Sequence, residues 1–81
     1  MLGRLIMRDH YHVVYYPLLD RFEGHGFGKV RFDEAHYFLS EDHATQWAIA
    51  YADSPWMAVP VVGGKPFLND SLIKFVTMGY R

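Results

Sequence analysis

The sequence predicts a two-layer α+β domain, in which an antiparallel sheet of about four or five strands carries one main helix on one face. Three observations lead to this prediction. A helical stripe of small and aromatic residues lies in the middle of the chain, valine-rich segments flank it, and glycine clusters separate the segments. The chain has 81 residues, so residues 1–81 are expected to form a single domain.

The main helix is expected over residues 40–53. Ser40 is a suitable N-cap, because its hydroxyl can accept a hydrogen bond from a free backbone N–H of the first turn. Two acidic residues follow it, where the helix dipole favours negative charge, and Pro55 ends the helix. The apolar stripe consists of Ala44, Trp47, Ala48, Tyr51 and Ala52. Its alanines allow close approach, so we expect this helix to hold the sheet from behind.

Ahead of the helix, residues 10–19 are predicted to form a strand, because valine and tyrosine favour extended structure. Its odd-numbered face is the drier one and is assigned to the core, while the even-numbered face is left open. Pro17 indicates an edge position, since proline cannot donate to a sheet ladder. The odd face carries Tyr11, Val13 and Tyr15, and the even face carries His10, His12, Val14 and Tyr16.

Two further strands are expected before the helix. Residues 20–28 contain three glycines and are interpreted as a connection. Residues 29–32 are predicted to be a strand, and residues 35–39 are favoured as another because their aromatic residues are poor helix formers. The residues of the second strand expected to pack on the helix are Gly28, Val30 and Phe32.

The segments after the helix predict a hairpin. Residues 56–62 are valine-rich and favour a strand, with Pro60 indicating an edge. Gly63-Gly64 is typical of a tight hairpin turn, since glycine adopts positive φ without strain, and residues 65–68 would form the returning strand. Residues 70–79 could form a short C-terminal helix or a strand, and both interpretations remain open.

Composition excludes several classes of function. Hydrophobic residues make up 51 % of the chain and aromatic residues 17 %, which is typical of a folded domain and favours self-association, for example as a homodimer. There is no cysteine, so disulfides and thiolate metal sites are excluded. The net charge of −1 does not favour general electrostatic binding to nucleic acid. No apolar run approaches the roughly 20 residues that span a bilayer, so we expect a cytoplasmic location and no membrane partner.

Residues 25–32 carry the sharpest local signal. Their sequence, HGFGKVRF, resembles the RNP1 octapeptide of RNA-recognition motifs. His25 stands where that family has a basic residue, and Lys29 replaces an aromatic residue that stacks on a base. The segment before the octapeptide is too short for the strand, helix and strand that precede it in the family. We therefore interpret it as a glycine-rich hairpin leading into an amphipathic strand, and keep single-stranded RNA binding by residues 26–32 as an alternative.

A metal-dependent enzyme is a further alternative. His10 and His12 lie two residues apart, hence on one face of a strand, and Glu34 and His36 repeat this spacing. Zinc sites need three or four protein ligands, and no sequence rule brings the two pairs together. Capping explains Ser40 and its acidic neighbours, and no G-x-S-x-G nucleophile elbow occurs. We therefore predict no metal, no cofactor and no enzymatic activity.

An aromatic and basic surface on the open sheet face remains as the candidate site. Aromatic residues and arginine are the residue types that anchor protein interfaces. We therefore expect a small non-catalytic domain that binds another protein or protein complex. The predicted partner-binding residues are Phe27, Lys29, Arg31, His12, Tyr16 and Trp56.

A family resemblance agrees with this expectation. The second half of the chain has the spacing Ala44, Ala48, Ala52, then Ser54-Pro55 and a valine strand that ends near Gly64. In size, order of elements and small-residue spacing it resembles small phage-encoded inhibitor proteins, among them some anti-CRISPR proteins. The resemblance implies a protein that binds a host complex, such as a CRISPR–Cas complex, and blocks it in the host cytoplasm. It carries over no functional residue.

Overall fold

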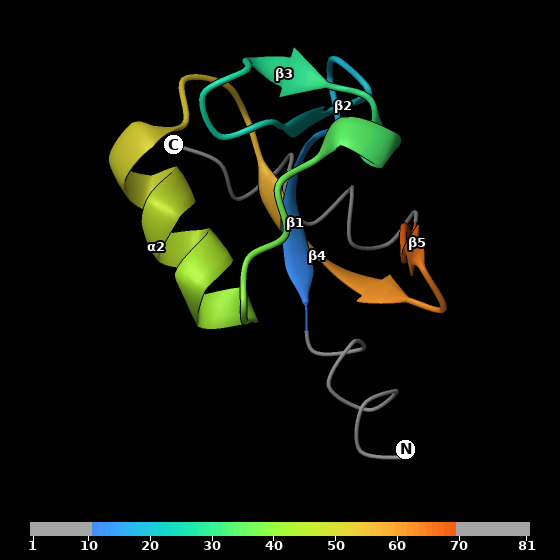
Figure 1. Ribbon diagram of the computed structural model, residues 1–81. Helices are drawn as coiled ribbons and strands as arrows, with labels where there is room; N and C mark the ends of the chain where they lie inside the picture. Colours follow the sequence, from blue (N-terminus) through green and yellow to red (C-terminus); the bar gives the residue numbers. More distant parts are fainter. Residues whose placement is uncertain (1–10, 70–81) are drawn as a thin grey trace.

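The computed structural model of the protein describes residues 11–69. A five-strand antiparallel sheet and one main helix, α2 (Glu41–Tyr51), form this part of the chain, which confirms the predicted α+β class (Figure 1). The predicted segment 70–79 lies outside the described residues. The sheet has the order β3-β2-β1-β4-β5. The bounds are β1 (His12–Tyr16), β2 (Arg21–Glu23), β3 (Lys29–Val30), β4 (Met57–Val62) and β5 (Lys65–Pro66), with a short 3₁₀ helix, η1 (Phe32–Glu34).

Helix α2 follows the sequence prediction closely. The Ser40 hydroxyl oxygen accepts a hydrogen bond from the backbone N–H of His43 at 3.2 Å, so the predicted N-cap is confirmed. The chain leaves the helix at Ala52, whose ψ of 136° is extended. Ala44 and Ala48 are the buried residues of the helix, and they pack against the sheet. The small side chains therefore bring the helix close to the strands, as expected.

Strand β1 lies in the middle of the sheet, between β2 and β4. Its antiparallel registers place Tyr15 opposite Phe22 on one side and Val13 opposite Val59 on the other. The edge position predicted from Pro17 is wrong, because this proline follows the last residue of β1 and removes no donor from the ladder. The first strand is therefore the centre of the fold rather than its margin.

Strand β4 is also an inner strand, so the edge predicted from Pro60 is wrong as well. The carbonyl oxygen of Pro60 accepts a hydrogen bond from the Phe67 N–H at 2.9 Å. In an extended strand the N–H and C=O of one residue point the same way, so the missing donor faces β5, just beyond the last β4–β5 residue pair. The predicted Gly63-Gly64 turn is confirmed, with φ values of 60° and 78°.

Three short segments before the helix differ from the prediction. Residues 20–28 are not only a connection, because they contain strand β2. The strand predicted at residues 29–32 ends at Val30, and η1 follows in place of further pairing. Of residues 35–39, Phe38 alone forms a bridge, exchanging hydrogen bonds of 2.7 and 3.0 Å with His12. These segments are set by strand pairing, with neighbouring strands for β2 and β3 and with the distant His12 for Phe38, and residue propensity does not encode that pairing.

Both faces of β1 are buried, and this decides where the helix lies. Val13 and Tyr15 belong to one core cluster with side chains of β2 and β4, which confirms the odd face as core. Val14 and Tyr16 belong to a second cluster with Phe38 and the alanines of α2. The helix therefore covers the even face, which the sequence analysis left open. Phe32, expected under the helix, packs against the first cluster instead.

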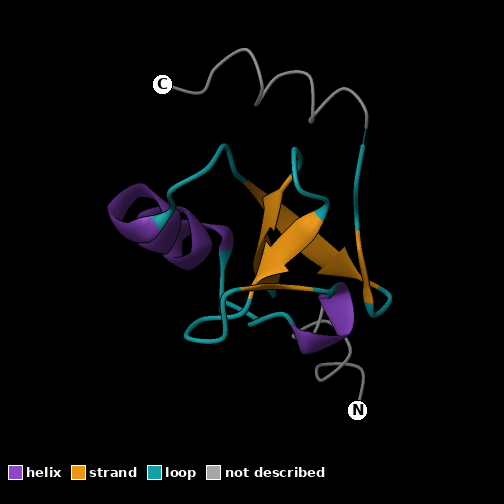
Figure 2. Cartoon of the chain, turned by 90° about the horizontal axis from the view of Figure 1, so that it is seen from above, coloured by secondary structure: helices purple, strands orange, loops and turns teal. Residues whose placement is uncertain are grey.

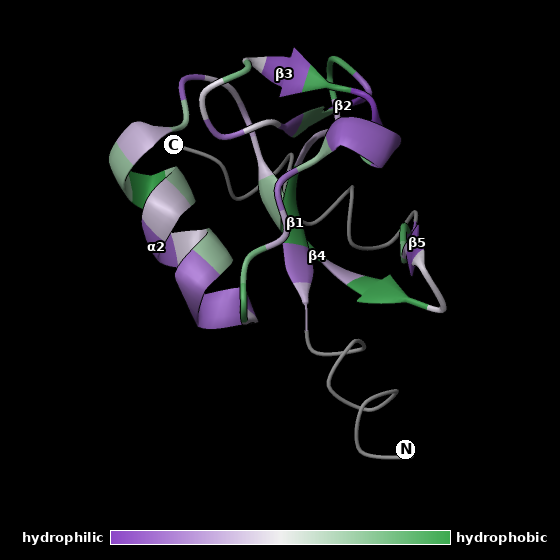
Figure 3. Ribbon diagram, in the orientation of Figure 1, coloured by the Kyte–Doolittle hydropathy of each residue, from purple (hydrophilic) through white to green (hydrophobic). Residues whose placement is uncertain are grey.

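Figures 2 and 3 agree with this layering of helix and sheet. Figure 2 shows α2 beside a strongly twisted sheet rather than across an open, flat one. Figure 3 shows hydrophobic colour on parts of β1 and β4 at the centre, and hydrophilic colour on the first turn of α2. The first turn of α2 is thus polar and capped, and the helix packs its small apolar side chains on the sheet.

Candidate functional site

The fold separates the six predicted partner-binding residues. The Tyr16 side chain is 1 % exposed beneath α2, so its predicted place on an open sheet face is wrong. Lys29 is engaged within the chain, because its Nζ lies 2.7 Å from the Asp53 Oδ1 and 5.0 Å from the centroid of the Tyr16 ring. Neither side chain is available as predicted, since the helix and its following loop cover this side of the sheet.

The other predicted residues lie apart from one another. Phe27 is 85 % exposed in the loop between β2 and β3, and Arg31 is exposed between β3 and η1. His12 is half-buried, with its backbone paired to Phe38. Trp56 is half-buried and packs against the core cluster beneath α2. Of the six, Phe27 is the one whose large apolar side chain is widely exposed.

A buried carboxylate lies beneath the loop that carries Phe27. Glu23, at the end of β2, is 7 % exposed, and both of its carboxylate oxygens accept hydrogen bonds. The Tyr16 hydroxyl donates to Oε1 at 2.6 Å, and the backbone N–H of His25 donates to Oε2 at 2.8 Å. Burial, and then the hydrogen bond to Glu23, raise the pKa of the Tyr16 hydroxyl. This carboxylate is therefore a structural anchor for the loop.

Two histidines meet above this anchor. The ring centroids of His25 and His36 are 4.3 Å apart, and the His36 ring meets Phe38 edge-on at 4.6 Å. The His36 N–H also donates to the backbone oxygen of Glu23 at 2.9 Å, which fixes the segment after η1 against β2. Burial lowers the pKa of His36, the proximity of His25 lowers it further, and Glu23 opposes both effects.

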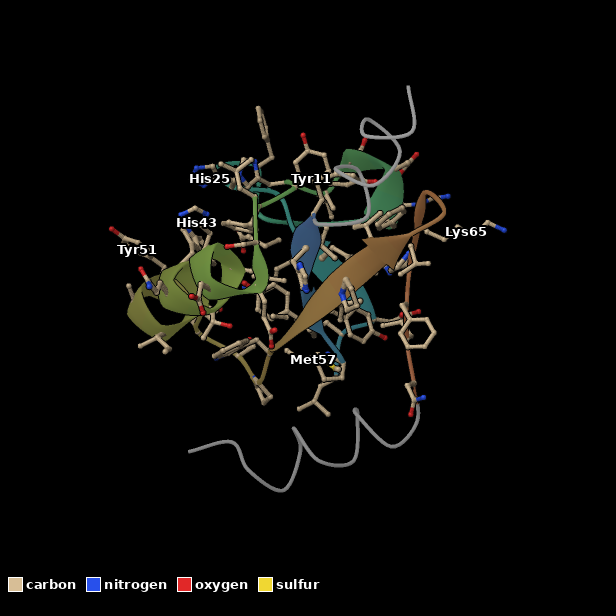
Figure 4. The ribbon with its side chains drawn as sticks, turned by 90° about the horizontal axis from the view of Figure 1, so that it is seen from below. Tyr11, His25, His43, Tyr51, Met57 and Lys65 are labelled. Atoms are coloured by element: carbon tan, nitrogen blue, oxygen red, sulfur yellow. The ribbon has the colours of Figure 1, made fainter. Side chains whose placement is uncertain are left out.

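The ring contacts continue from the histidines onto α2. The His25 ring lies 6.1 Å from the Trp47 ring, and Trp47 lies 5.4 Å from Tyr51. Tyr51 is 70 % exposed. We call these side chains together with Phe27 the hairpin–helix surface; its members are His25, Phe27, His36, Trp47 and Tyr51. Figure 4 shows His25 and Tyr51 on the α2 side of the molecule, away from Lys65.

The histidines of residues 11–69 do not gather a metal site. Within residues 11–69, no group of three or more His, Cys, Asp or Glu side chains is placed to hold a metal ion. Glu34 and His12 are not brought to His36 in such a group, and His10 lies outside the described part of the chain. Nor does any helix in the described part have the length and apolar character needed to cross a bilayer. The hairpin–helix surface offers flat rings and imidazole nitrogens for contact.

Sequence reasoning missed most of this surface for identifiable reasons. Trp47 and Tyr51 were both assigned to the helical stripe that packs on the sheet. Only their positions along the helix distinguish Tyr51 from the buried members of this stripe. Tyr51 is the last residue of α2, the first place where a stripe can extend past the sheet that it covers. His25 was noticed only as a mismatch in the RNP1-like octapeptide. Its contact with His36 depends on a turn with φ of 53° at His25, which no sequence pattern predicts.

Comparison with known proteins adds no relative to this geometry. No family model, curated protein or solved structure matches the chain.

Proposed function

We propose that this protein is a small non-catalytic domain that binds another protein through the hairpin–helix surface. The observation that carries the proposal is the exposure of Phe27 at 85 % and Tyr51 at 70 %, on two elements joined by the ring contacts of Trp47. Aromatic side chains of this size contribute most of their binding free energy when a partner removes them from water. Protein interfaces are correspondingly enriched in Tyr, Trp and Phe.

The charges near the surface favour a protein partner over a nucleic acid. Lys29, the cation of the adjacent strand β3, forms an ion pair with Asp53. The side chain of Arg21 donates to the backbone oxygen of its neighbour Asp20. Arg31, between β3 and η1, is the exposed cation that remains, whereas a single-stranded nucleic acid would require a groove of several free cations beside the stacking rings. Phe27 also lies on a loop rather than on a strand, so it does not form the flat stacking platform of an RNA-recognition sheet.

We propose inhibition of a host macromolecular complex as the consequence of binding. This part of the proposal rests on the resemblance to small phage-encoded inhibitors, which is carried by size, small-residue spacing and the order of an alanine-rich helix before a short hairpin. In the fold this order is α2, β4 and β5. Binding alone would suffice for such a role, because a domain that covers a functional surface of a larger complex needs no chemistry of its own.

A capture experiment with matched variants tests the proposed surface. Tagged protein would be incubated with lysate of the native host, comparing the wild type, the double variant Phe27→Ser/Tyr51→Ser and Ile49→Ser. Ile49 is the control because it is 72 % exposed on α2, two residues from Tyr51 and therefore on the other side of the helix. We expect stoichiometric partners with the wild type and with Ile49→Ser, and their loss with the double variant.

Two results would count against the proposal. Capture of the same partners by the double variant, with its fold intact by circular dichroism, would remove the hairpin–helix surface as the binding site. Capture of nothing by the wild type would remove the binding function. Stoichiometric RNA in the wild-type fraction, lost at raised salt, would favour the RNA-binding alternative instead.

A further inference from the structure

The loop between β2 and β3 is a tight hairpin held by few contacts. The Gly24 N–H donates to the Gly28 backbone oxygen at 2.7 Å, which closes the loop. A side chain at Gly24 would lie 2.9 Å from that same oxygen, so the closure requires glycine. His25 and Gly26 have positive φ values of 53° and 108°. One backbone hydrogen bond therefore closes the loop, and the Glu23 carboxylate and the ring contacts of His25 hold it to the rest of the molecule.

Those contacts are made chiefly with another imidazole. The His25 ring lies 4.3 Å from His36, and farther from Phe38 and Trp47, at 6.3 and 6.1 Å. When both imidazoles are neutral, these contacts are ordinary aromatic packing. When both carry a proton, two like charges lie 4.3 Å apart between the centroids of the exposed His25 ring and the half-buried His36 ring, and they repel each other.

The charged and titratable groups around the pair determine the sign of the effect. Glu23 of β2 attracts an imidazolium, yet both its oxygens are already hydrogen-bonded, by Tyr16 of β1 and by the His25 backbone. From β3, the Lys29 ammonium lies over the Tyr16 ring and adds positive charge, which Asp53 offsets. Helix α2 presents the neutral rings of Trp47 and Tyr51, with the exposed His43 in its first turn.

We propose that His25 and His36 form a pH-sensitive contact that holds the β2–β3 hairpin against α2 while both rings are neutral and releases it when the pair is protonated. Burial lowers the pKa of His36, which likewise favours the neutral ring in the closed state. A histidine that ionises less readily in the closed state stabilises that state above its ordinary pKa, and the contribution is lost as the pH falls below it. Acid therefore favours the open hairpin.

The pH-sensitive contact also has a consequence for partner binding, and this consequence rests on the proposed function. Phe27 lies two residues from His25 in the same hairpin, and release of the hairpin breaks the ring contact between His25 and Trp47 that joins this hairpin to α2. The hairpin–helix surface is then no longer continuous. Partner binding is accordingly expected to weaken in mildly acidic solution and to recover on neutralisation.

The test uses the free full-length protein and needs no partner. Histidine ring signals and backbone amide exchange would be followed by NMR between about pH 7.5 and about pH 5.5. We expect the amides of Gly24 and His25 to lose at least about threefold of their protection against hydrogen exchange over this range, while the amides of β1 keep theirs. The His36 ring signal should titrate over the same pH range as the loss.

Variants separate the pair from general effects of acid. His36→Phe keeps an aromatic ring but cannot be protonated, and His25→Asn keeps a residue type that tolerates positive φ. Both variants should abolish the pH dependence of the hairpin amides. His43→Gln removes an exposed imidazole of α2 and should leave the pH dependence unchanged. If one pair variant fails to fold, the other carries the test.

Three results would overturn the inference. They are hairpin amides whose protection is the same at both pH values, a pH response that persists in the pair variants, and loss of protection throughout β1 at the acidic pH, which would mean global unfolding. The NMR measurement is made without a partner, so a failed capture experiment would not contradict the pH-sensitive contact. Equally, a hairpin that does not respond to pH would not contradict the proposed partner binding.

Discussion

At the scale of single residues, the Glu23 carboxylate holds the hairpin to the sheet. It is buried, and it is stabilised by the Tyr16 hydroxyl at 2.6 Å and the His25 N–H at 2.8 Å. A buried carboxylate that loses one donor retains its desolvation cost, so the donors are worth more than ordinary exposed hydrogen bonds. The stability of the hairpin–helix surface therefore depends on a hydroxyl group beneath it.

The first prediction compares the two tyrosines of β1. Tyr16→Phe removes the donor to Glu23 and should lower the free energy of unfolding by about 1–3 kcal/mol, because the carboxylate oxygen is left buried. Tyr15→Phe removes a hydrogen bond of 2.9 Å to the exposed Asp20, where water can take its place, and should cost at most about 1 kcal/mol. Urea unfolding measures both. Equal losses would contradict the anchoring role of Glu23.

The second prediction concerns alkaline solution. Burial, and then the hydrogen bond to Asp20, raise the pKa of Tyr15 to about 12, from 10.0 for a free tyrosine, and burial raises the pKa of Tyr16 as well. The unfolded chain therefore loses these phenol protons first as the pH rises. Their contribution to stability is complete below about pH 10 and declines above it. Urea midpoints between about pH 8 and about pH 11 should fall more steeply for the wild type than for Tyr15→Phe.

At the scale of elements, helix α2 lies close to the sheet because two alanines face it. Ala44 and Ala48 are 0 % and 1 % exposed, and the core on that side is completed by larger side chains of β1. Protein interiors are packed too densely to accept extra methyl groups without movement. The spacing between helix and sheet is thus fixed by the smallest side chains in the stripe.

The third prediction tests that spacing. Ala44→Leu should destabilise the fold by about 1–3 kcal/mol, because the larger side chain forces the helix away from β1. Ala50→Leu makes the same change on the exposed side of α2 and should alter stability by less than about 0.5 kcal/mol. Thermal unfolding followed by circular dichroism compares the two. Similar melting temperatures for both variants would show that α2 is not tightly packed.

Elements whose signals are local could be predicted from the sequence. The cap at Ser40, the alanine stripe and the Gly63-Gly64 turn each act over a few residues, and all are confirmed. The edge positions inferred from Pro17 and Pro60 depended on which strands pair, and they were wrong. A proline reports only its own missing N–H, and whether that donor is needed depends on the neighbouring strand.

The candidate site was less predictable for the same reason. The sheet face that carries Tyr16 was predicted to be open because alternation marks two faces without saying which one a helix covers. Because α2 covers that face, Tyr16 lies in the core, and Phe27 is the widely exposed aromatic residue of the predicted set. His25 and His36 are eleven residues apart, beyond the range of any helix or turn spacing, so only the fold could bring their rings together.

At the scale of the whole molecule, both faces of the central strand are covered, so contact with a partner falls to the surface of the loops and helix. The hairpin–helix surface joins elements from the first and second halves of the chain through the rings of His25 and Trp47. Phe27 and Tyr51 are exposed to solvent, and the half-buried Trp47 ring, in contact with His25 and Tyr51, joins the two elements. We propose that a partner protein binds here.

Site-specific photocrosslinking tests this claim most directly. A photoreactive amino acid would replace Phe27 in one variant and Ile49, equally open to solvent but across α2 from Tyr51, in another, with both expressed in the native host. The account predicts light-dependent adducts with one other protein from position 27 and none from position 49. Adducts of equal yield from both positions, adducts only with a second copy of this chain, or no adduct from position 27 would contradict it.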